Sequence, residues 1–218
     1  MASNKKGLQT KEYIYCVAKK LFYTVGYDKA TLSLISKEAN VPIGLIPYHF
    51  KNKDNILIMI YDDYLTKIHQ CIDAQVGSDE IDNSILYHGV LSRIYYQIIF
   101  GDTCNRRVYH EVLKKKSNYR ILHRSIGEIY RGYLKDFNII ISEEEFEARL
   151  YCDFGARREF FLHYLNEDLS MSIQDTVTLV NGIIPRLLGI DQNLVTAILD
   201  KSYAIYNSIC YDDIVFLV

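Results

Sequence analysis

Residues 31–57 read TLSLISKEANVPIGLIPYHFKNKDNIL. Thr31 can cap a short helix, and the Asn-Val-Pro sequence at residues 40–42 is typical of a tight turn. A second short helix is expected to begin near Ile43. Two short helices joined by a tight turn form a helix-turn-helix, whose second helix can enter the major groove of DNA. This segment therefore indicates a helical head that docks on a duplex.

The rest of the chain shows helical periodicity on both sides of this segment. Between Ile14 and Val25, apolar residues recur on one face of a helix of about 16 residues, and Gly26 follows as a stop signal. Further helices are expected over residues 53–76, 83–100, 104–117, 119–137, 143–166, 172–188 and 192–210. Strands are not expected, because no alternation of apolar and polar residues lies between hairpin turns. The predicted fold class is all-α.

The composition excludes several classes of protein. Of the 218 residues, 49% are hydrophobic and 24% are charged, which excludes a disordered chain. The longest stretch without Asp, Glu, Lys or Arg covers residues 39–50, which is too short to span a bilayer, and the N-terminus lacks the apolar core of a signal peptide. We therefore expect a cytoplasmic protein without membrane contact. The five cysteines form no CxxC pair, so reduced thiols are expected and neither a metal nor another cofactor is.

The charge is unevenly distributed along the chain. Residues 1–60 hold nine lysines against four acidic residues, whereas the whole chain holds 25 basic and 27 acidic residues and has a net charge of −2. The remaining residues therefore carry a net charge of −7. A basic head on an acidic body points to a polyanionic partner at the N-terminal end.

The segment from residue 14 to residue 57 resembles the TetR (tetracycline-repressor) family of bacterial regulators. The residues at the family's spacing are Ile14, Ala18, Leu21, Phe22, Gly26, Tyr27, Thr31, Ile35, Ala39, Val41, Gly44, His49, Phe50, Lys53 and Leu57. The resemblance implies an N-terminal three-helix, helix-turn-helix DNA-binding domain, residues 1–52, and a C-terminal helical domain that binds an effector and dimerises, residues 53–218. This second part resembles the family only in its size and helical character.

The resemblance also implies roles in DNA binding. Thr31 would bond a phosphate, residues 43–45 would face base edges or a thymine methyl group, and Lys53 would hold a phosphate beside the amides of the helix that it begins. Phe50 would belong to the core of the head. The candidate DNA-contacting residues are Thr31, Ile43, Gly44, Leu45, Pro47, Tyr48, His49, Lys51 and Lys53.

Two prolines depart from the family's pattern. Pro42 is compatible with the start of a helix, where its missing N–H would be unpaired in any case. Pro47 is harder to accommodate, because in a helix that begins at Ile43 its missing N–H would have bonded the Ile43 carbonyl. We therefore expect a DNA-reading helix that is one turn long or bent, with Tyr48 supplying the aromatic contact to DNA.

The C-terminal part is rich in tyrosine, with 14 of the 19 tyrosines of the chain. Tyrosine combines an apolar body with a polar tip and suits the wall of a ligand pocket. On helices that line the pocket in the resembled family, the candidate effector-binding residues are Tyr95, Tyr96, Tyr109, His110, Tyr130, Asp153, Arg157 and Phe161. Asp153 and Arg157 are i,i+4 partners on an otherwise apolar face. They form either a buried structural ion pair or a pair of which one member orients a charged ligand.

The last two predicted helices are expected to form a homodimer interface. Their apolar stripes consist of Ile173, Val177, Val180, Ile184 and Leu187 on one helix and Leu194, Ile198, Ile205 and Ile209 on the other. The resemblance implies a four-helix interface here, although the core of a monomer could use the same stripes. We expect a repressor that binds a near-palindromic double-stranded DNA operator as a dimer. A small, aromatic or lipophilic effector would release it.

Two alternatives belong to other classes of function. An all-helical di-iron enzyme needs two Glu-x-x-His motifs, and the sequence holds none; HExxH, GxSxG, P-loop and GxGxxG motifs are also missing. No catalytic residue is therefore expected. A TetR-like receptor that acts through a protein partner, with weakened DNA reading, is favoured by Pro47.

Overall fold

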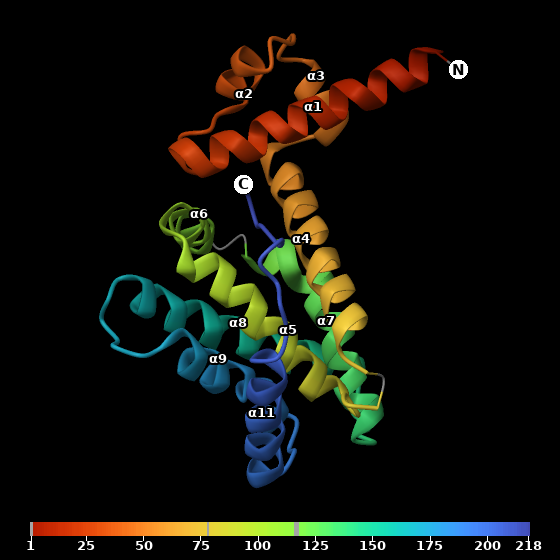
Figure 1. Ribbon diagram of the computed structural model, residues 1–218, viewed down its shortest axis with the longest axis vertical. Coiled ribbons are helices and arrows are strands. Elements are labelled where there is room, and N and C mark those ends of the chain that lie inside the picture. Colours follow the sequence, from red (N-terminus) through yellow and green to blue (C-terminus); the bar gives the residue numbers. More distant parts are fainter. Residues whose placement is uncertain (1, 78, 116–117) are drawn as a thin grey trace.

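The computed structural model describes the backbone of residues 2–77, 79–115 and 118–218, and the side chains of residues 7–77, 79–115 and 125–218. This part of the chain is built of helices without strands (Figure 1). The helices are α1 (Ala2–Val25), α2 (Leu32–Glu38), α3 (Leu45–Phe50), α4 (Lys53–Gln75), α5 (Ser84–Gly101), α6 (Thr103–Lys114), α7 (Asn118–Asp136), α8 (Glu143–Leu165), α9 (Ile173–Asn181), α10 (Ile183–Leu187) and α11 (Gln192–Tyr206). The prediction of an all-α fold is confirmed. None of the described helices is long and apolar enough to cross a membrane.

Helices α1, α2 and α3 form a small head at one end of the molecule, and α4 leads from it into a larger body (Figure 1). The core of the head is made of Ile14, Ala18 and Phe22 from α1, with Ile35 from α2 and Phe50 from α3, all buried. The spacing of these α1 residues places them on one face of the helix, as the sequence predicts. Helix α1 begins at Ala2 and is longer than predicted, because the sequence before Ile14 has no recurring apolar face that would reveal a helix.

The turn between α2 and α3 is built by local hydrogen bonds. Asn40 adopts a left-handed conformation with φ of 49° directly after α2. Its N–H donates to the Lys37 carbonyl over 3.1 Å, and the N–H of Val41 donates to the Ser36 carbonyl over 3.1 Å. These two bonds form a Schellman motif, which satisfies carbonyls at a helix end. The predicted tight turn at residues 40–42 is confirmed.

Helix α3 begins at Leu45, two residues later than predicted, and this corrects the expectation for Pro47. The Ile43 carbonyl accepts from the N–H of Ile46 over 3.2 Å, inside the turn that precedes the helix. Pro47 is therefore the third residue of α3, where an N–H has no helical partner and its absence costs no hydrogen bond. The expectation was a helix that is one turn long or bent, and with six residues α3 is longer than one turn.

Helix α5 is the central element of the body, and it is apolar on almost every side. It packs against α4, α6, α7, α9 and α11. Buried Arg93 ties two of these helices to α5: its guanidinium donates to Thr178 Oγ1 on α9 over 2.8 Å and to the Leu199 carbonyl on α11 over 3.0 Å. A helix that is hydrophobic all round must be buried, and α5 takes that place.

The C-terminal helices differ from the prediction in two ways. The predicted helix over residues 172–188 is two helices, α9 and α10, which meet at Gly182. Pro185 explains the break, because it has no N–H to donate to the Asn181 carbonyl and its ring would clash there. Helix α11 ends at Tyr206 rather than at residue 210.

The apolar stripes predicted for the dimer interface lie mostly in the core of the single chain. Val177, Val180 and Ile184 have no exposed surface, and Ile198 and Ile205 are also buried. The reason is the apolar surface of α5, which both α9 and α11 cover. The large apolar side chains that these last helices do expose are Leu179, Leu187, Leu194 and Tyr203.

Residues 207–218 form a tail that returns along α4 toward the head (Figure 1). Gln75 near the end of α4 holds its beginning: its amide donates to the Cys210 carbonyl over 2.7 Å and accepts from the Cys210 N–H over 2.9 Å. Further along, Phe216 is 1% exposed and packs on Tyr61 and Tyr64 of α4, with ring centroids 4.9 and 5.1 Å away. The tail therefore links the end of α11 to the middle of α4.

Candidate functional site

The first candidate site is the outer surface of the head, where α3 exposes an apolar and aromatic edge. Ile43 is 52% exposed and Tyr48 is 79% exposed, although both side chains carry a large apolar surface that is usually buried. Gly44 and Pro47 are exposed as well, whereas Leu45 and His49 are half-buried. Exposed apolar residues gathered on one element mark a contact surface. Ile43, Gly44, Pro47 and Tyr48 therefore form an exposed edge over the start of α3 and the turn before it, and this edge is a candidate contact surface.

Thr31 lies at the start of α2 and acts as its N-cap. Its hydroxyl oxygen accepts from the N–H of Leu34 over 3.1 Å, as the sequence predicts for a cap. The hydroxyl hydrogen is not used in this bond. Thr31 is exposed, so its O–H can still donate to an anion outside the head.

Two lysines follow α3, and they differ in orientation. Lys51 is exposed and ends α3 in a left-handed conformation with φ of 66°. Lys53 begins α4, but its ammonium lies over the ring of Tyr27 at 4.1 Å and donates to the Tyr27 carbonyl over 2.6 Å. Burial lowers the pKa of Lys53, and the nearby charge of Lys115 adds to this effect. Phosphate contact by Lys53 stays a prediction, with one of its three N–H donors already occupied.

The second candidate site is a cavity of about 260 Å³ in the body. Its wall is mainly aromatic and aliphatic. The lining residues are Leu65, His88, Leu91, Ser92, Tyr95, Tyr96, Tyr109, Ile126, Tyr130, Tyr151, Phe154, Gly155, Arg157 and Arg158. Tyr151 and Gly155 of α8 are exposed, so the cavity reaches the surface along this helix. An apolar hollow with a few polar groups is the usual form of a small-molecule site.

The structure brings together most of the predicted effector-binding residues. Tyr95, Tyr96, Tyr109, Tyr130 and Arg157 line the cavity. The other three predicted residues are outside its wall: Asp153 behind Arg157, Phe161 against the ring of Tyr96 at 4.8 Å, and His110 on α6.

Asp153 and Arg157 form a buried ion pair beside the cavity, with Nε and Oδ2 2.8 Å apart. The Tyr130 hydroxyl donates to the same carboxylate oxygen over 2.7 Å, and Arg157 Nη1 donates to Asn181 Oδ1 over 3.2 Å. The structural ion pair, one of two readings of this spacing, is therefore present. Because its carboxylate shares the burial, Arg157 adds no net charge to the wall.

Several lining residues were not predicted from the sequence, and His88 is the most informative of them. Its side chain is buried on α5, and its Nδ1 is hydrogen-bonded to the Tyr133 hydroxyl over 2.5 Å. Burial lowers the pKa of His88 to about 3, and the positive charge of Arg157 contributes, so the imidazole is neutral near pH 7. Ser92 lies one turn and His88 two turns before Tyr95 and Tyr96 on the same helix. That i,i+4 spacing was the signal that could have found them.

The head matches a known family. Residues 14–60 match the model of the family described as bacterial regulatory proteins, tetR family. The chain is 25% identical over 171 residues to the fatty acid metabolism regulator protein of Bacillus subtilis, covering 75% of this chain and 86% of that protein. It is also 25% identical over 117 residues to the transcriptional regulator TtgR of Pseudomonas putida, covering 54% of this chain and 55% of that protein.

One relative of another kind also matches. A segment of 132 residues is 30% identical to a probable GTP-binding protein, EngB of Ehrlichia canis, covering 55% of this chain and 58% of that protein. The P-loop sequence that cradles nucleotide phosphates is missing here, so this match does not carry GTP binding over to the chain.

Solved structures extend the likeness beyond the head. The crystal structure of RolR in complex with the ligand resorcinol has a TM-score of 0.61 and 17% sequence identity, and covers 89% of this chain and 95% of that chain. At this identity the match shows a shared fold. Together with the helix-turn-helix geometry of the head, these findings show an all-α fold whose head, over residues 14–60, matches the tetR family of bacterial regulatory proteins.

Proposed function

We propose that the protein is a repressor that binds a near-palindromic operator as a homodimer and releases it when a small aromatic or lipophilic effector fills the cavity. The observation that carries this proposal is the pairing of an exposed reading edge on α3 with an aromatic cavity in the same chain. The resorcinol bound to RolR supports an aromatic effector for a neighbour of the same fold. Two heads that match successive major grooves give an affinity that one small head does not reach.

In this proposal α3 lies in the major groove. Ile43, Gly44 and Leu45 contact base edges and thymine methyl groups, and Tyr48 reaches a base or phosphate beside them. Four polar or charged residues surround this edge and contact the sugar-phosphate backbone of the DNA: Thr31, His49, Lys51 and Lys53. The domain boundary near residue 52 follows from this division, since α4 begins at Lys53 and leads away from the DNA.

The test of DNA binding starts with genomic fragments that the purified protein retains at low salt. Fluorescence anisotropy on a retained fragment should then show affinity that falls with salt, with a log–log slope of about −0.9 for each phosphate contacted. Lys51→Ala should reduce that slope by about 1 unit. Lys135→Ala, a lysine exposed at the far end of α7, is the matched control and should leave the slope unchanged. Equal affinity for retained and random fragments would overturn the proposal.

Tyr48 has its own test, because its hydroxyl and its ring make separate predictions. Tyr48→Phe should weaken operator binding if the hydroxyl donates to a phosphate, by about the tenfold that one hydrogen bond to a charged group contributes. Tyr48→Ala should weaken it further by removing the ring. Unchanged affinity in both variants would exclude Tyr48 from the interface. The alternative, a receptor that acts through a protein partner, was favoured by Pro47, and α3 accommodates that proline.

A further inference from the structure

The wall of the cavity has an unbalanced positive charge. Its lining residues include two arginines, Arg157 and Arg158, and no aspartate or glutamate among the described residues. Arg157 is balanced by Asp153, and His88 is neutral. The carboxylate nearest to Arg158 is that of Glu159, 3.8 Å away and mostly exposed, so the pair is weak. The charge of Arg158 is thus available to a ligand.

Arg158 also holds the end of a helix. Its Nε donates to the Leu113 carbonyl over 3.1 Å, and its Nη2 donates to the Lys114 carbonyl over 3.3 Å. These are the last carbonyls of α6, which have no partner within the helix. A cation at a helix C-terminus is favourable, but a carboxylate forms a stronger, bidentate pair with arginine than two neutral carbonyls do.

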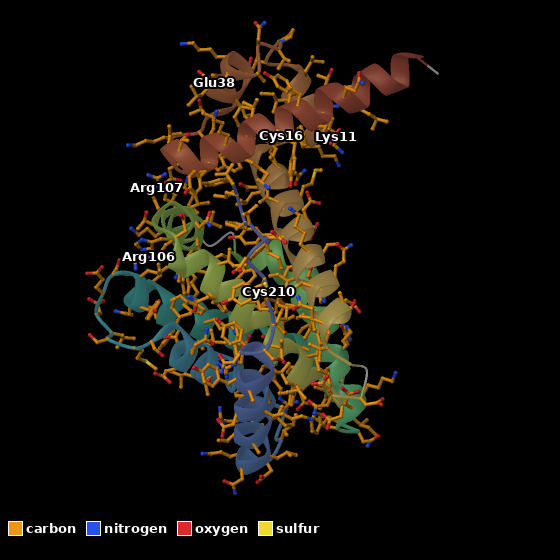
Figure 2. All side chains as sticks on the ribbon, in the orientation of Figure 1. Lys11, Cys16, Glu38, Arg106, Arg107 and Cys210 are labelled. Carbon is orange, nitrogen blue, oxygen red and sulfur yellow. The ribbon has the colours of Figure 1, made fainter. Side chains whose placement is uncertain are left out.

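Helix α6 is in turn bonded to the head. Arg107 donates to the Tyr23 carbonyl at the end of α1 over 2.6 Å, and Glu111 accepts from the N–H of Asp28 over 2.9 Å. Lys115, one residue beyond α6, forms an ion pair with Asp28. Figure 2 shows Arg107 beside the end of α1, where the head meets α6. A displacement of the end of α6 therefore acts on the contact between body and head.

The position and hydrogen bonds of Arg158 indicate which chemical group the effector carries. We infer that the effector is an aromatic carboxylate, whose rings lie among the tyrosines and whose carboxylate takes the Arg158 guanidinium from the Leu113 and Lys114 carbonyls. The end of α6 then loses its cap, and the bonds from Arg107, Glu111 and Lys115 to the head shift with it. This inference rests on the proposed function, in which the cavity is the effector site.

The shape and chemistry of the cavity select the rest of the ligand. Five tyrosines and Phe154 supply flat aromatic surfaces and ring edges, which favour stacked or edge-to-face contact with another ring. A cationic ligand is disfavoured, because the lining offers it no carboxylate and Arg158 repels it. A neutral ligand of the same shape keeps the ring contacts and loses the ion pair.

Calorimetry on the full chain tests this inference with three probes of one shape. We expect 2-naphthoate to bind about tenfold to a hundredfold more tightly than 2-naphthamide, since a hydrogen bond to a charged group contributes that much. The ammonium form of 2-naphthylmethylamine should bind more weakly than both. Decanoate separates aromatic from aliphatic carboxylates and should bind more weakly than 2-naphthoate. Equal binding of acid and amide, tighter binding of decanoate, or no binding by any probe would overturn the inference.

Two variants locate the effect. Arg158→Gln should remove the preference for 2-naphthoate over 2-naphthamide, and Arg158→Lys should keep part of it. Arg131→Gln is the matched control, because Arg131 pairs with exposed Glu143 on another face and does not line the cavity. Thermal melting without ligand verifies that all three variants fold. A preference that survives Arg158→Gln would contradict the assignment.

The coupling to DNA is measured separately, by anisotropy on a retained genomic fragment. We expect 2-naphthoate to weaken operator binding by wild-type protein at least tenfold, and 2-naphthamide to weaken it far less. Failure of all DNA binding would defeat the proposed function while leaving the calorimetric result standing. Intact DNA binding with equal effects of acid and amide would defeat this inference alone.

Discussion

Pro47 occupies the third position of α3, where no backbone N–H is bonded within the helix. Replacing it by alanine adds an N–H that water can satisfy. We therefore expect Pro47→Ala to change the free energy of unfolding by less than about 1 kcal/mol. Operator affinity, measured by fluorescence anisotropy, should stay within about threefold of the wild-type value.

His49→Pro is the matched comparison, two positions further along the same helix. The N–H of His49 is in register with the Leu45 carbonyl, so proline there should lower the free energy of unfolding by about 3 kcal/mol. Urea denaturation measures both variants. A tenfold gain in operator affinity on Pro47→Ala would mean that this proline does limit DNA reading.

His88 makes folding stability depend on pH. Burial depresses its pKa to about 3 in the folded protein, whereas in the unfolded chain it has the ordinary value of 6.5. Between these two values the unfolded chain binds a proton that the folded chain does not, so stability falls as the pH falls. The expected contribution is up to about 1.4 kcal/mol for each pH unit.

Urea denaturation at pH 7.5 and pH 5.5 checks this prediction. The loss on acidification should be smaller in His88→Gln, which has nothing to protonate at this position. His163→Gln is the control of opposite sign: hydrogen bonding to Asp168 raises the pKa of His163, so its ion pairs are favoured at low pH. The same loss of stability in wild type and His88→Gln would contradict the account.

At the scale of single residues, local signals were enough for part of the site. The cap at Thr31 and the ion pair of Asp153 with Arg157 each depend on neighbours three or four positions away. Arg158 depends instead on carbonyls 44 and 45 positions away. No pattern within α8 indicates that contact, because it exists only once α6 and α8 are packed.

The C-terminal tail has no secondary structure, yet it should contribute to stability. Phe216 packs on two tyrosine rings of α4, so Phe216→Ala leaves a cavity and should lower the free energy of unfolding by about 3 kcal/mol or more. The neighbouring Val215 is 39% exposed, and Val215→Ala should cost less than about 1 kcal/mol. Chemical denaturation of the two variants makes the comparison, and equal small losses would show that the tail does not hold α4.

At the scale of elements, periodicity predicted the long helices well. Helices α4, α5 and α8 agree with the expected ranges to within one residue at each end, because each has a cap and a buried face. The break between α9 and α10 was missed, although Pro185 stands in the sequence. The tail was not expected at all, since a short irregular segment has no period and its burial depends on α4.

At the scale of the whole molecule, an apolar stripe does not reveal what covers it. The stripes of α9 and α11 have the spacing of an interface, and in the structure α5 covers most of them. A central helix that is apolar on every side needs partners on every side. A second subunit can cover only the apolar residues that the last helices still expose, which are Leu179, Leu187, Leu194 and Tyr203.

The dimer itself can therefore be tested at those exposed residues. Leu179 on α9 is 47% exposed and Leu187 on α10 is 41% exposed, so glutamate at both positions should leave the core of the chain intact. Each subunit of this variant would place two negative charges in an apolar interface, where they would be buried without partners. The dimer should therefore dissociate. We expect sedimentation analysis to show monomers of the Leu179→Glu, Leu187→Glu variant and operator affinity to fall more than tenfold. Leu169→Glu, in the segment between α8 and α9, is the matched control. If the double variant stayed dimeric and bound DNA normally, the interface would lie on another face.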